Sequence, residues 1–231
     1  MEELGIDYNL VEIDKTNKPD YFVELYQRAN PLPGARAKVP VLHMDDLVLC
    51  ESTVISEFLS SMDLDGSAGE QQSRYWPRNS KKQATLRLFM ELCGSRFSSY
   101  LDFTRVQDMK QVEEKHSIFQ DRMREVDAFL SMYSIDEFTL ADAHVAPFVQ
   151  RSCGILPAPY DPISICQEFK LENLRRWIES LLKRESVIKT CPTEEIQSKR
   201  EKLTKRLARI PQQVTEHATR DGPRQRKTIK S

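Results

Sequence analysis

The feature that most constrains the fold is a change in hydrophobic periodicity near residue 66. Before this point, short apolar runs predict strands between helices. After it, apolar residues recur every three or four positions, which is typical of amphipathic helices. The segment between them contains Asp65-Gly66-Ser67-Ala68-Gly69, a composition typical of a linker. The sequence therefore predicts a small α/β unit followed by an all-α unit.

The composition bounds the class of protein. The chain has 231 residues, of which 39% are hydrophobic and 30% charged, so a sizeable core can form. Its 34 basic and 35 acidic residues give a net charge of −1, which argues against a globally basic nucleic-acid binder. No apolar run approaches the roughly 20 residues of a membrane span, and the acidic start does not resemble a signal peptide. We therefore expect a cytoplasmic protein with no membrane partner.

Four segments are expected along the chain. Residues 1–65 form the α/β unit, 66–79 the linker, 80–192 the helical unit and 193–231 a tail. The tail contains 11 basic and 5 acidic residues, a net charge of +6. Apolar residues at helical spacing predict a narrow helix that ends before Pro211. A solvated helix with a disordered end fits this composition, and so does a surface for nucleic acid or another acidic partner.

The individual elements follow from local patterns. In the first unit we expect a strand over 8–13, a helix over 19–26, a hairpin of strands 39–43 and 47–50, and a helix over 52–62. In the second unit we expect helices over 80–103, 112–133, 140–153 and 171–182. Turn residues at Asp45-Asp46 connect the two strands of the hairpin.

The candidate binding residues lie around this hairpin. Pro40 cannot donate to a sheet, so it begins a strand, and a cis Val39–Pro40 bond would present the Val39 backbone to an extended peptide. Ser52 begins a helix, whose free N–H groups attract a carboxylate. Glu51 can accept from a ligand ammonium, and Lys38 can pair with a second carboxylate. These groups suit a small zwitterionic peptide with two carboxylates and one amine.

The ordered run Asn30-Pro31, Lys38-Val39-Pro40-Val41-Leu42 and Leu49-Cys50-Glu51-Ser52 resembles the glutathione-binding half of cytosolic glutathione transferases. The resemblance implies a thioredoxin-like N-terminal domain, a helical C-terminal domain and glutathione as co-substrate. It places Val39 and Pro40 at the cysteinyl backbone of glutathione and Lys38 near its glycyl carboxylate. Glu51 and Ser52 would hold the γ-glutamyl end.

Two further matches lie in the helical unit. Phe138-Thr139-Leu140-Ala141-Asp142 resembles the family's capping motif, in which Thr139 and Asp142 form a reciprocal capping box. Leu174-Arg175-Arg176-Trp177-Ile178 with Thr190-Cys191-Pro192 resembles the family's closing helix. The resemblance covers about residues 1–192. It leaves out the tail and the insertion Leu32-Pro33-Gly34-Ala35-Arg36-Ala37.

The family's catalytic Tyr, Ser or Cys lies at the first strand and the following helix start, and this chain begins after that point. We therefore expect a chain shortened at its N-terminus and assign no catalytic residue. The resemblance implies a homodimer that conjugates glutathione to electrophiles, or exchanges thiols as in the omega and lambda classes. The helix over 77–103 and the loop near Arg105 would shape the electrophile pocket. The alternative is a non-catalytic interaction or scaffold module.

The cysteines and histidines do not predict a metal or disulfide site. The five cysteines are scattered without CxxC spacing. Cys50 and Cys93 lie near the expected site, but neither is at the helix start where the family's nucleophile would be. The four histidines have no metal-ligand spacing. We expect these residues to be ordinary core or surface side chains.

Overall fold

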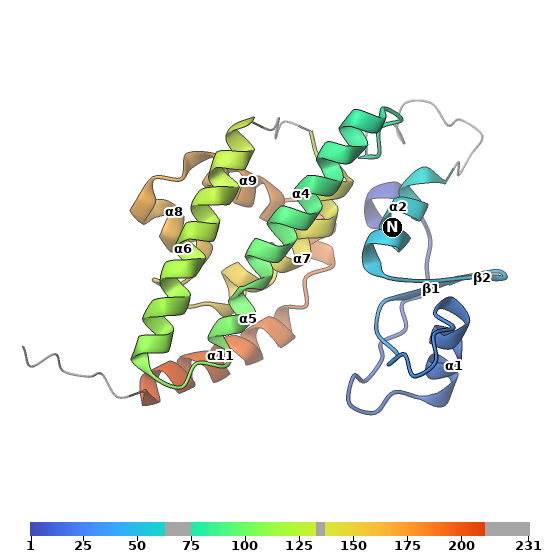
Figure 1. Cartoon of the computed structure of the whole chain (residues 1–231), viewed down its shortest axis with the longest axis horizontal. Helices are drawn as coiled ribbons and strands as arrows, with labels where there is room; N and C mark the ends of the chain where they lie inside the picture. Colours follow the sequence, from blue (N-terminus) through green and yellow to red (C-terminus); the bar gives the residue numbers. More distant parts are fainter. Residues whose placement is uncertain (63–74, 133–136, 211–231) are drawn as a thin grey trace, which may run out of the picture.

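The computed structural model describes residues 1–62, 75–132 and 137–210, and it divides into two parts that lie side by side (Figure 1). The first part contains the turn η1 (Glu2–Leu4), helix α1 (Asp20–Ala29), strands β1 (Val41–Met44) and β2 (Leu47–Cys50), and helix α2 (Ser52–Ser61). The second part is helical: α4 (Ser80–Ser98), α5 (Tyr100–Phe103), α6 (Met109–Met132), α7 (Leu140–Ile155), α8 (Pro162–Phe169), α9 (Glu172–Leu182), α10 (Glu185–Lys189) and α11 (Thr193–Arg209). This confirms the predicted order of an α/β unit followed by a helical unit.

The α/β part is built on an antiparallel hairpin. Val41 pairs with Cys50 at its open end and Met44 with Leu47 at its turn. Helix α1 packs against the hairpin, and its Phe22 and Tyr26 are buried together with Ala37. Ala37 ends the predicted insertion, so the end of this longer loop contributes to the small core.

The strand predicted over residues 8–13 is absent. These residues are extended but form no ladder, and the sheet of the described residues contains β1 and β2 alone. An alternating sequence becomes a strand only when a neighbouring strand satisfies its backbone hydrogen bonds. Leu10 and Val11 are largely exposed, whereas Ile13 at the end of the segment packs against the small core of Phe22 and Tyr26.

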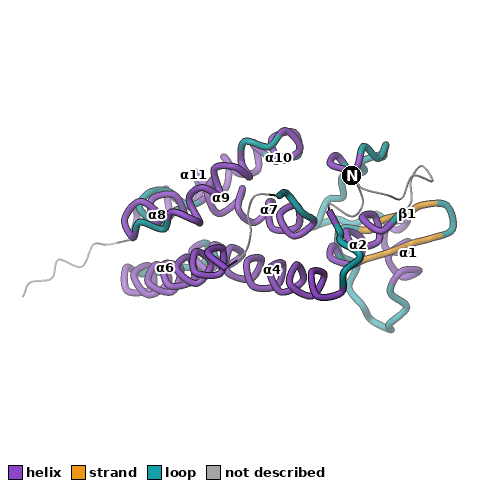
Figure 2. The backbone as a smooth tube through the Cα atoms, turned by 90° about the horizontal axis from the view of Figure 1, so that it is seen from above, coloured by secondary structure: helices purple, strands orange, loops and turns teal. Residues whose placement is uncertain are grey.

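The helical part encloses the main core. Helix α4 packs closely against α7, and α6 packs against α4 and α9 (Figure 2). Trp177 of α9 lies between two α4 rings, with centroids 5.6 Å from Phe89 and 5.9 Å from Phe97. Two short helices, α8 and α10, were not predicted. Asp161 caps α8 by accepting from the N–H groups of Ile163 and Ser164, with Pro162 at the first position, so a recognisable start signal was present.

Helix α11 is a structural element of the helical part rather than a detached tail. Its Ile196 and Leu203 are buried in the main core, and the helix packs on α7. The predicted boundary at residue 193 therefore does not separate an independent tail from this core. Residues 211–231 of that segment lie outside the described residues.

The predicted linker overlaps the helical part at its end. Residues 66–74 lie outside the described residues, but Tyr75 and Trp76 are buried. Trp76 belongs to the main core, and the Arg87 guanidinium lies 5.1 Å from its ring centroid. The helical part therefore begins a few residues before α4.

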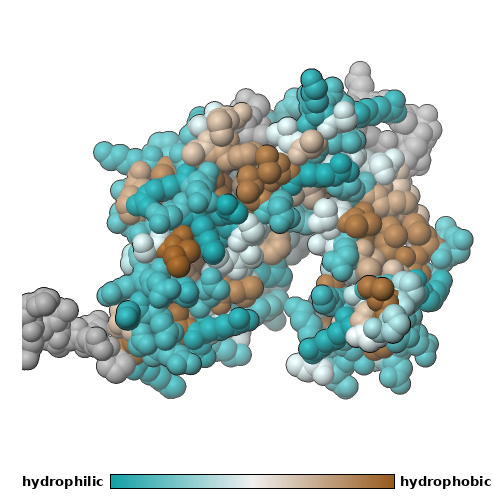
Figure 3. Space-filling view, in the orientation of Figure 1, coloured by the Kyte–Doolittle hydropathy of each residue, from teal (hydrophilic) through white to brown (hydrophobic). Residues whose placement is uncertain are grey.

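The exterior seen in Figure 3 is mainly hydrophilic, with apolar patches on both parts. Over the described ranges, no helix combines the length and apolar character needed to cross a membrane. The same ranges contain no group of His, Cys, Asp and Glu side chains arranged to hold a metal ion.

Candidate functional site

The hairpin register brings the predicted binding residues together. Val41 pairs with Cys50, so Pro40 and Glu51 are the next residues beyond that pair on the two chains. The Val39–Pro40 peptide bond is cis, as predicted. Lys38, Val39, Pro40, Glu51 and Ser52 are all exposed. We call these five residues the cradle.

The backbone at the start of α2 has an unusual conformation. Glu51 has φ 71° and ψ 115°, and its side chain makes no capping hydrogen bond to the helix. A positive φ costs a non-glycine residue on the order of 1 kcal/mol, and such conformations concentrate at binding sites. The first helical hydrogen bond runs from the Ile55 N–H to the Glu51 carbonyl at 3.0 Å. The N–H groups before Ile55 therefore have no acceptor within the helix.

The charged groups of the cradle are available to a ligand. Across residues 1–62, 75–132 and 137–210, neither Lys38 nor Glu51 has an ion pair or a side-chain hydrogen bond in the structure. The N-terminus of α2 adds the positive end of a helix dipole beside Glu51. A carboxylate can bind the free N–H groups, an ammonium can bind Glu51, and a second carboxylate can bind Lys38.

Comparison with known proteins identifies the class of fold. The sequence model of the family "Glutathione S-transferase, N-terminal domain" matches residues 1–61. The structure resembles a trimeric glutathione transferase of Leishmania, TDR1, with a TM-score of 0.63 and 20% identity. That match covers 91% of this chain and 44% of the Leishmania chain, so this chain spans less than half of that protein.

Two plant structures match over most of both chains. Poplar glutathione transferase F1 has a TM-score of 0.57 and 18% identity, with 87% of this chain and 89% of the poplar chain covered. Glutathione transferase F7 from Populus trichocarpa has a TM-score of 0.59 and 19% identity, with 85% and 90% covered. No curated protein sequence matches the chain. The fold is therefore that of glutathione transferases, a thioredoxin-like N-terminal domain followed by a helical domain.

The other predicted positions lie away from the cradle. Thr139 and Asp142 form a capping box at the start of α7, in the helical part. The Asp142 carboxylate accepts from the Thr139 N–H at 2.8 Å and from the Trp177 Nε1–H at 2.8 Å, so its surroundings are structural. A pocket lies beside η1, α2 and α7, and it contains no residue of 77–105, the segment expected to shape an electrophile pocket.

Sequence reasoning missed a polar network that joins the N-terminal turn to the helical part. The Glu3 carboxylate accepts from Arg184 Nε at 2.6 Å, from the Tyr75 hydroxyl at 3.1 Å, and from the Ser186 hydroxyl. The Arg184 guanidinium also stacks on Phe138, 3.8 Å from the ring centroid. Glu3 and Arg184 are separated by 181 positions, so no local spacing pattern signals their contact.

Two cysteines are predicted to resist modification in the folded protein. Burial raises the pKa of the Cys93 thiol to about 12 and that of Cys166 to about 12. The thiolate is the reactive form, so both thiols should react with Ellman's reagent at pH 8 only after unfolding. Mass spectrometry of native and urea-unfolded samples would locate the modified cysteines. Rapid native modification of Cys93 would contradict the placement of this residue in the core.

Proposed function

We propose that the chain binds glutathione at the cradle and acts as a glutathione transferase-like protein. The observation that carries the proposal is the juxtaposition of the Val39 and Pro40 backbone with the uncapped start of α2 at Glu51 and Ser52. Glutathione has two carboxylates, one ammonium and an extended peptide backbone. Each of these groups has a complementary group in the cradle.

The proposed pose assigns one role to each part of the cradle. The γ-glutamyl carboxylate would accept from the Ser52 hydroxyl and the N–H groups at the start of α2, and its ammonium would donate to Glu51. The Val39 backbone would pair with the cysteinyl residue, beside Pro40. Lys38 would attract the glycyl carboxylate. No residue is assigned to activating the glutathione thiol.

Replacement of Ser52 with alanine should weaken glutathione binding about tenfold, because a hydrogen bond to a charged group contributes about 1.5 kcal/mol. Glu51→Gln should cause a similar loss by removing the charge opposite the ammonium. Isothermal titration of the full chain would measure both effects. Ser61→Ala is the matched control, because Ser61 is exposed at the opposite end of the same helix.

The same titration tests the proposal against its alternative. Folded wild-type protein that binds no glutathione would favour the non-catalytic interaction or scaffold module. If glutathione binds, turnover of an aryl chloride and of a small disulfide would distinguish conjugation from thiol exchange of the omega and lambda type. Binding unaffected by either cradle substitution would contradict the proposed pose.

The proposal includes assembly and location. We propose a homodimer in the cytoplasm, as the glutathione transferase fold favours. Exposed apolar side chains on neighbouring helices, Val54 of α2 and Leu88 of α4, offer contact area for a second copy. The molar mass in solution, measured by light scattering, would check this assembly against the 26.9 kDa of one chain.

A further inference from the structure

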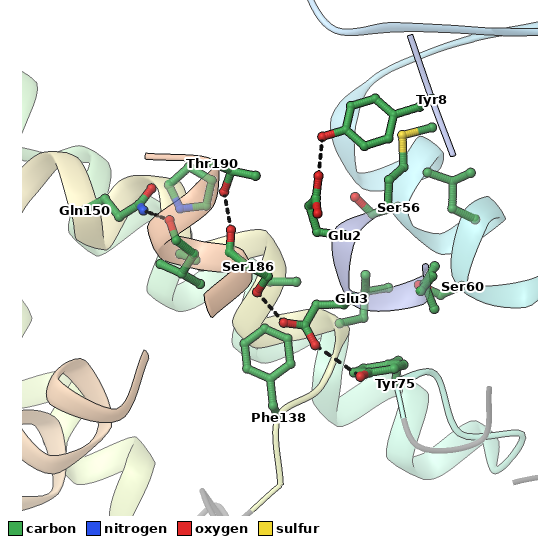
Figure 4. A pocket seen from close by; sticks show the side chains of 18 residues that line it. Glu2, Glu3, Tyr8, Ser56, Ser60, Tyr75, Phe138, Gln150, Ser186 and Thr190 are labelled. Atoms are coloured by element: carbon green, nitrogen blue, oxygen red, sulfur yellow. Dashed lines mark hydrogen bonds between the residues drawn. The ribbon is translucent and has the colours of Figure 1, made fainter. Parts of the chain in front are cut away.

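A pocket of about 340 Å³ lies where the N-terminal turn η1 meets α2, α7 and α10 (Figure 4). This volume is within the range that holds small organic molecules. The pocket is separate from the cradle. None of the five cradle residues lines the pocket. Of the α2 residues that do, Ser56 lies nearest to the cradle, one helical turn after Ser52.

The inner wall of this pocket is apolar. It contains Leu59 of α2, Leu140 and Ala146 of α7 and Val187 of α10, all of which are buried. Apolar surface of this kind favours a ligand that brings apolar area out of water. The wall therefore favours an aromatic or aliphatic body over a strongly polar one.

The two carboxylates at the rim, Glu2 and Glu3, are already paired with neighbouring side chains. Glu3 accepts from Arg184 and Tyr75, and Glu2 accepts from Lys189 at 2.7 Å and from the Tyr8 hydroxyl at 2.8 Å. Burial raises the pKa of the Glu3 carboxyl, but hydrogen bonds from Arg184 and Ser186 outweigh burial and hold that pKa below its ordinary value. A ligand therefore has no unpaired Glu2 or Glu3 charge to recognise. Met1 also lines the pocket, and burial lowers the pKa of its amino group, which favours the uncharged amine. These surroundings favour a neutral molecule.

Helix α7 gives the pocket wall a hydrogen-bond acceptor. In an α-helix each carbonyl points toward the N–H four residues later, and the residue four positions after Ala143 is Pro147, within α7. Proline has no N–H, so the helix cannot supply the usual donor to the Ala143 carbonyl. Ala143 and Pro147 both line the pocket. The carbonyl without a helical donor and the apolar wall therefore belong to residues that line the same pocket.

Gln150 marks the same face of α7, one turn beyond Pro147. Its Nε2 donates to the Val187 carbonyl at 2.5 Å, which fixes the amide at the pocket edge (Figure 4). This bond uses one of the two Nε2 hydrogens of Gln150. The acceptor on the α7 side of the pocket is therefore the Ala143 carbonyl.

We propose that this pocket binds a small, neutral, mostly aromatic molecule carrying one hydrogen-bond donor, such as a phenol, and that the donor binds the Ala143 carbonyl. Apolar burial provides most of the affinity, and the hydrogen bond selects the donor-bearing molecule. The proposal does not depend on glutathione binding, because the pocket and the cradle share no residue.

The test compares two probes of nearly equal size, 1-naphthol and 1-methoxynaphthalene, titrated calorimetrically into the full chain without glutathione. Wild type should bind 1-naphthol about fivefold more tightly, the effect of one net hydrogen bond. Pro147→Ala restores the N–H that pairs with the Ala143 carbonyl. This variant should therefore bind the two probes with about equal affinity. Circular dichroism would verify that the variant is folded.

A second variant tests the location. Ala143→Phe places a ring in the pocket and should reduce binding of both probes at least tenfold, whereas Ala84→Phe on the exposed face of α4 should not. Equal affinity of wild type for the two probes would overturn the proposal. So would a preference that survives in folded Pro147→Ala, or binding unaffected by Ala143→Phe. If Pro147→Ala does not fold, the affinities of wild type and Ala143→Phe for the two probes still test the proposal.

Discussion

Replacement of Asp142 with alanine should lower the free energy of unfolding by about 3 kcal/mol. Asp142 is buried, and its two oxygens serve different elements. Oδ2 accepts from the N–H and the hydroxyl of Thr139 at 2.8 and 2.7 Å, and Oδ1 accepts from Trp177 Nε1 at 2.8 Å. One carboxylate therefore caps α7 and joins it to α9.

The size of this effect follows from what the substitution leaves behind. Alanine would leave the Trp177 N–H buried without an acceptor, and leaving such a group unpaired costs about 1–3 kcal/mol. Loss of the capping box adds about 1 kcal/mol. Asp121→Ala is the matched control, because the Asp121 side chain is 65% exposed and its ion-pair partner among the described residues is Arg124 in its own helix. Such exposed pairs contribute little, so this control should lose less than about 0.5 kcal/mol.

Urea unfolding followed by circular dichroism would measure these differences. A double-mutant cycle with Trp177→Phe isolates the inter-helix bond, since phenylalanine removes the buried N–H and keeps an aromatic ring. We expect the two substitutions to be non-additive, with Asp142→Ala costing less in the Trp177→Phe background. Additive losses, or a loss below about 1 kcal/mol for Asp142→Ala alone, would show that this carboxylate does not connect the helices.

The second large effect is expected at Gly154, where α7 meets α11. A Cβ added to Gly154 would lie 2.5 Å from Cγ2 of Ile196, closer than two carbon atoms can approach. Ile196 is buried and branched at Cβ, so its methyl group cannot rotate away freely. We expect Gly154→Ala to destabilise the protein by about 2 kcal/mol, a typical cost of overpacking a core.

The helical glycine Gly94 provides the matched control. A Cβ there would lie 3.9 Å from Phe148, an ordinary contact, so Gly94→Ala should stabilise the protein by up to about 1 kcal/mol through helix propensity. Ile196→Ala removes the clashing methyl group. In that background Gly154→Ala should become neutral or stabilising, whereas with Ile196→Val, which keeps Cγ2, the loss should persist. A loss that is unchanged in the Ile196→Ala background would rule out the clash as its cause.

Local patterns determined much of this protein. The hairpin around Asp45-Asp46, the start of α2 at Ser52 and the long helices were predicted from periodicity and turn chemistry, and the structure has them. The cis Val39–Pro40 bond was also predicted. These features are encoded within a few residues, because capping, turn geometry and amphipathic spacing act over one or two turns of chain.

Local patterns gave wrong or incomplete predictions where an element depends on a partner that is distant in the sequence. Residues 8–13 alternate like a strand but find no neighbour to pair with, so they remain outside the sheet. The stripe of α11 was predicted, but its Ile196 and Leu203 proved to be buried in the main core, where Ile196 packs on Gly154 of α7. A periodic pattern shows which face of an element is apolar, and it does not show what covers that face.

By itself, then, the sequence determined the hairpin, the long helices, the capping box of Thr139 and Asp142, and the candidate cradle from Lys38 to Ser52. Only the tertiary structure decided that Glu3 pairs with Arg184, that Asp142 reaches Trp177, and that a pocket forms beside Pro147. The physical reason is the range of the interactions. Caps and turns are settled between near neighbours, whereas pockets and buried ion pairs exist only after distant segments have packed together.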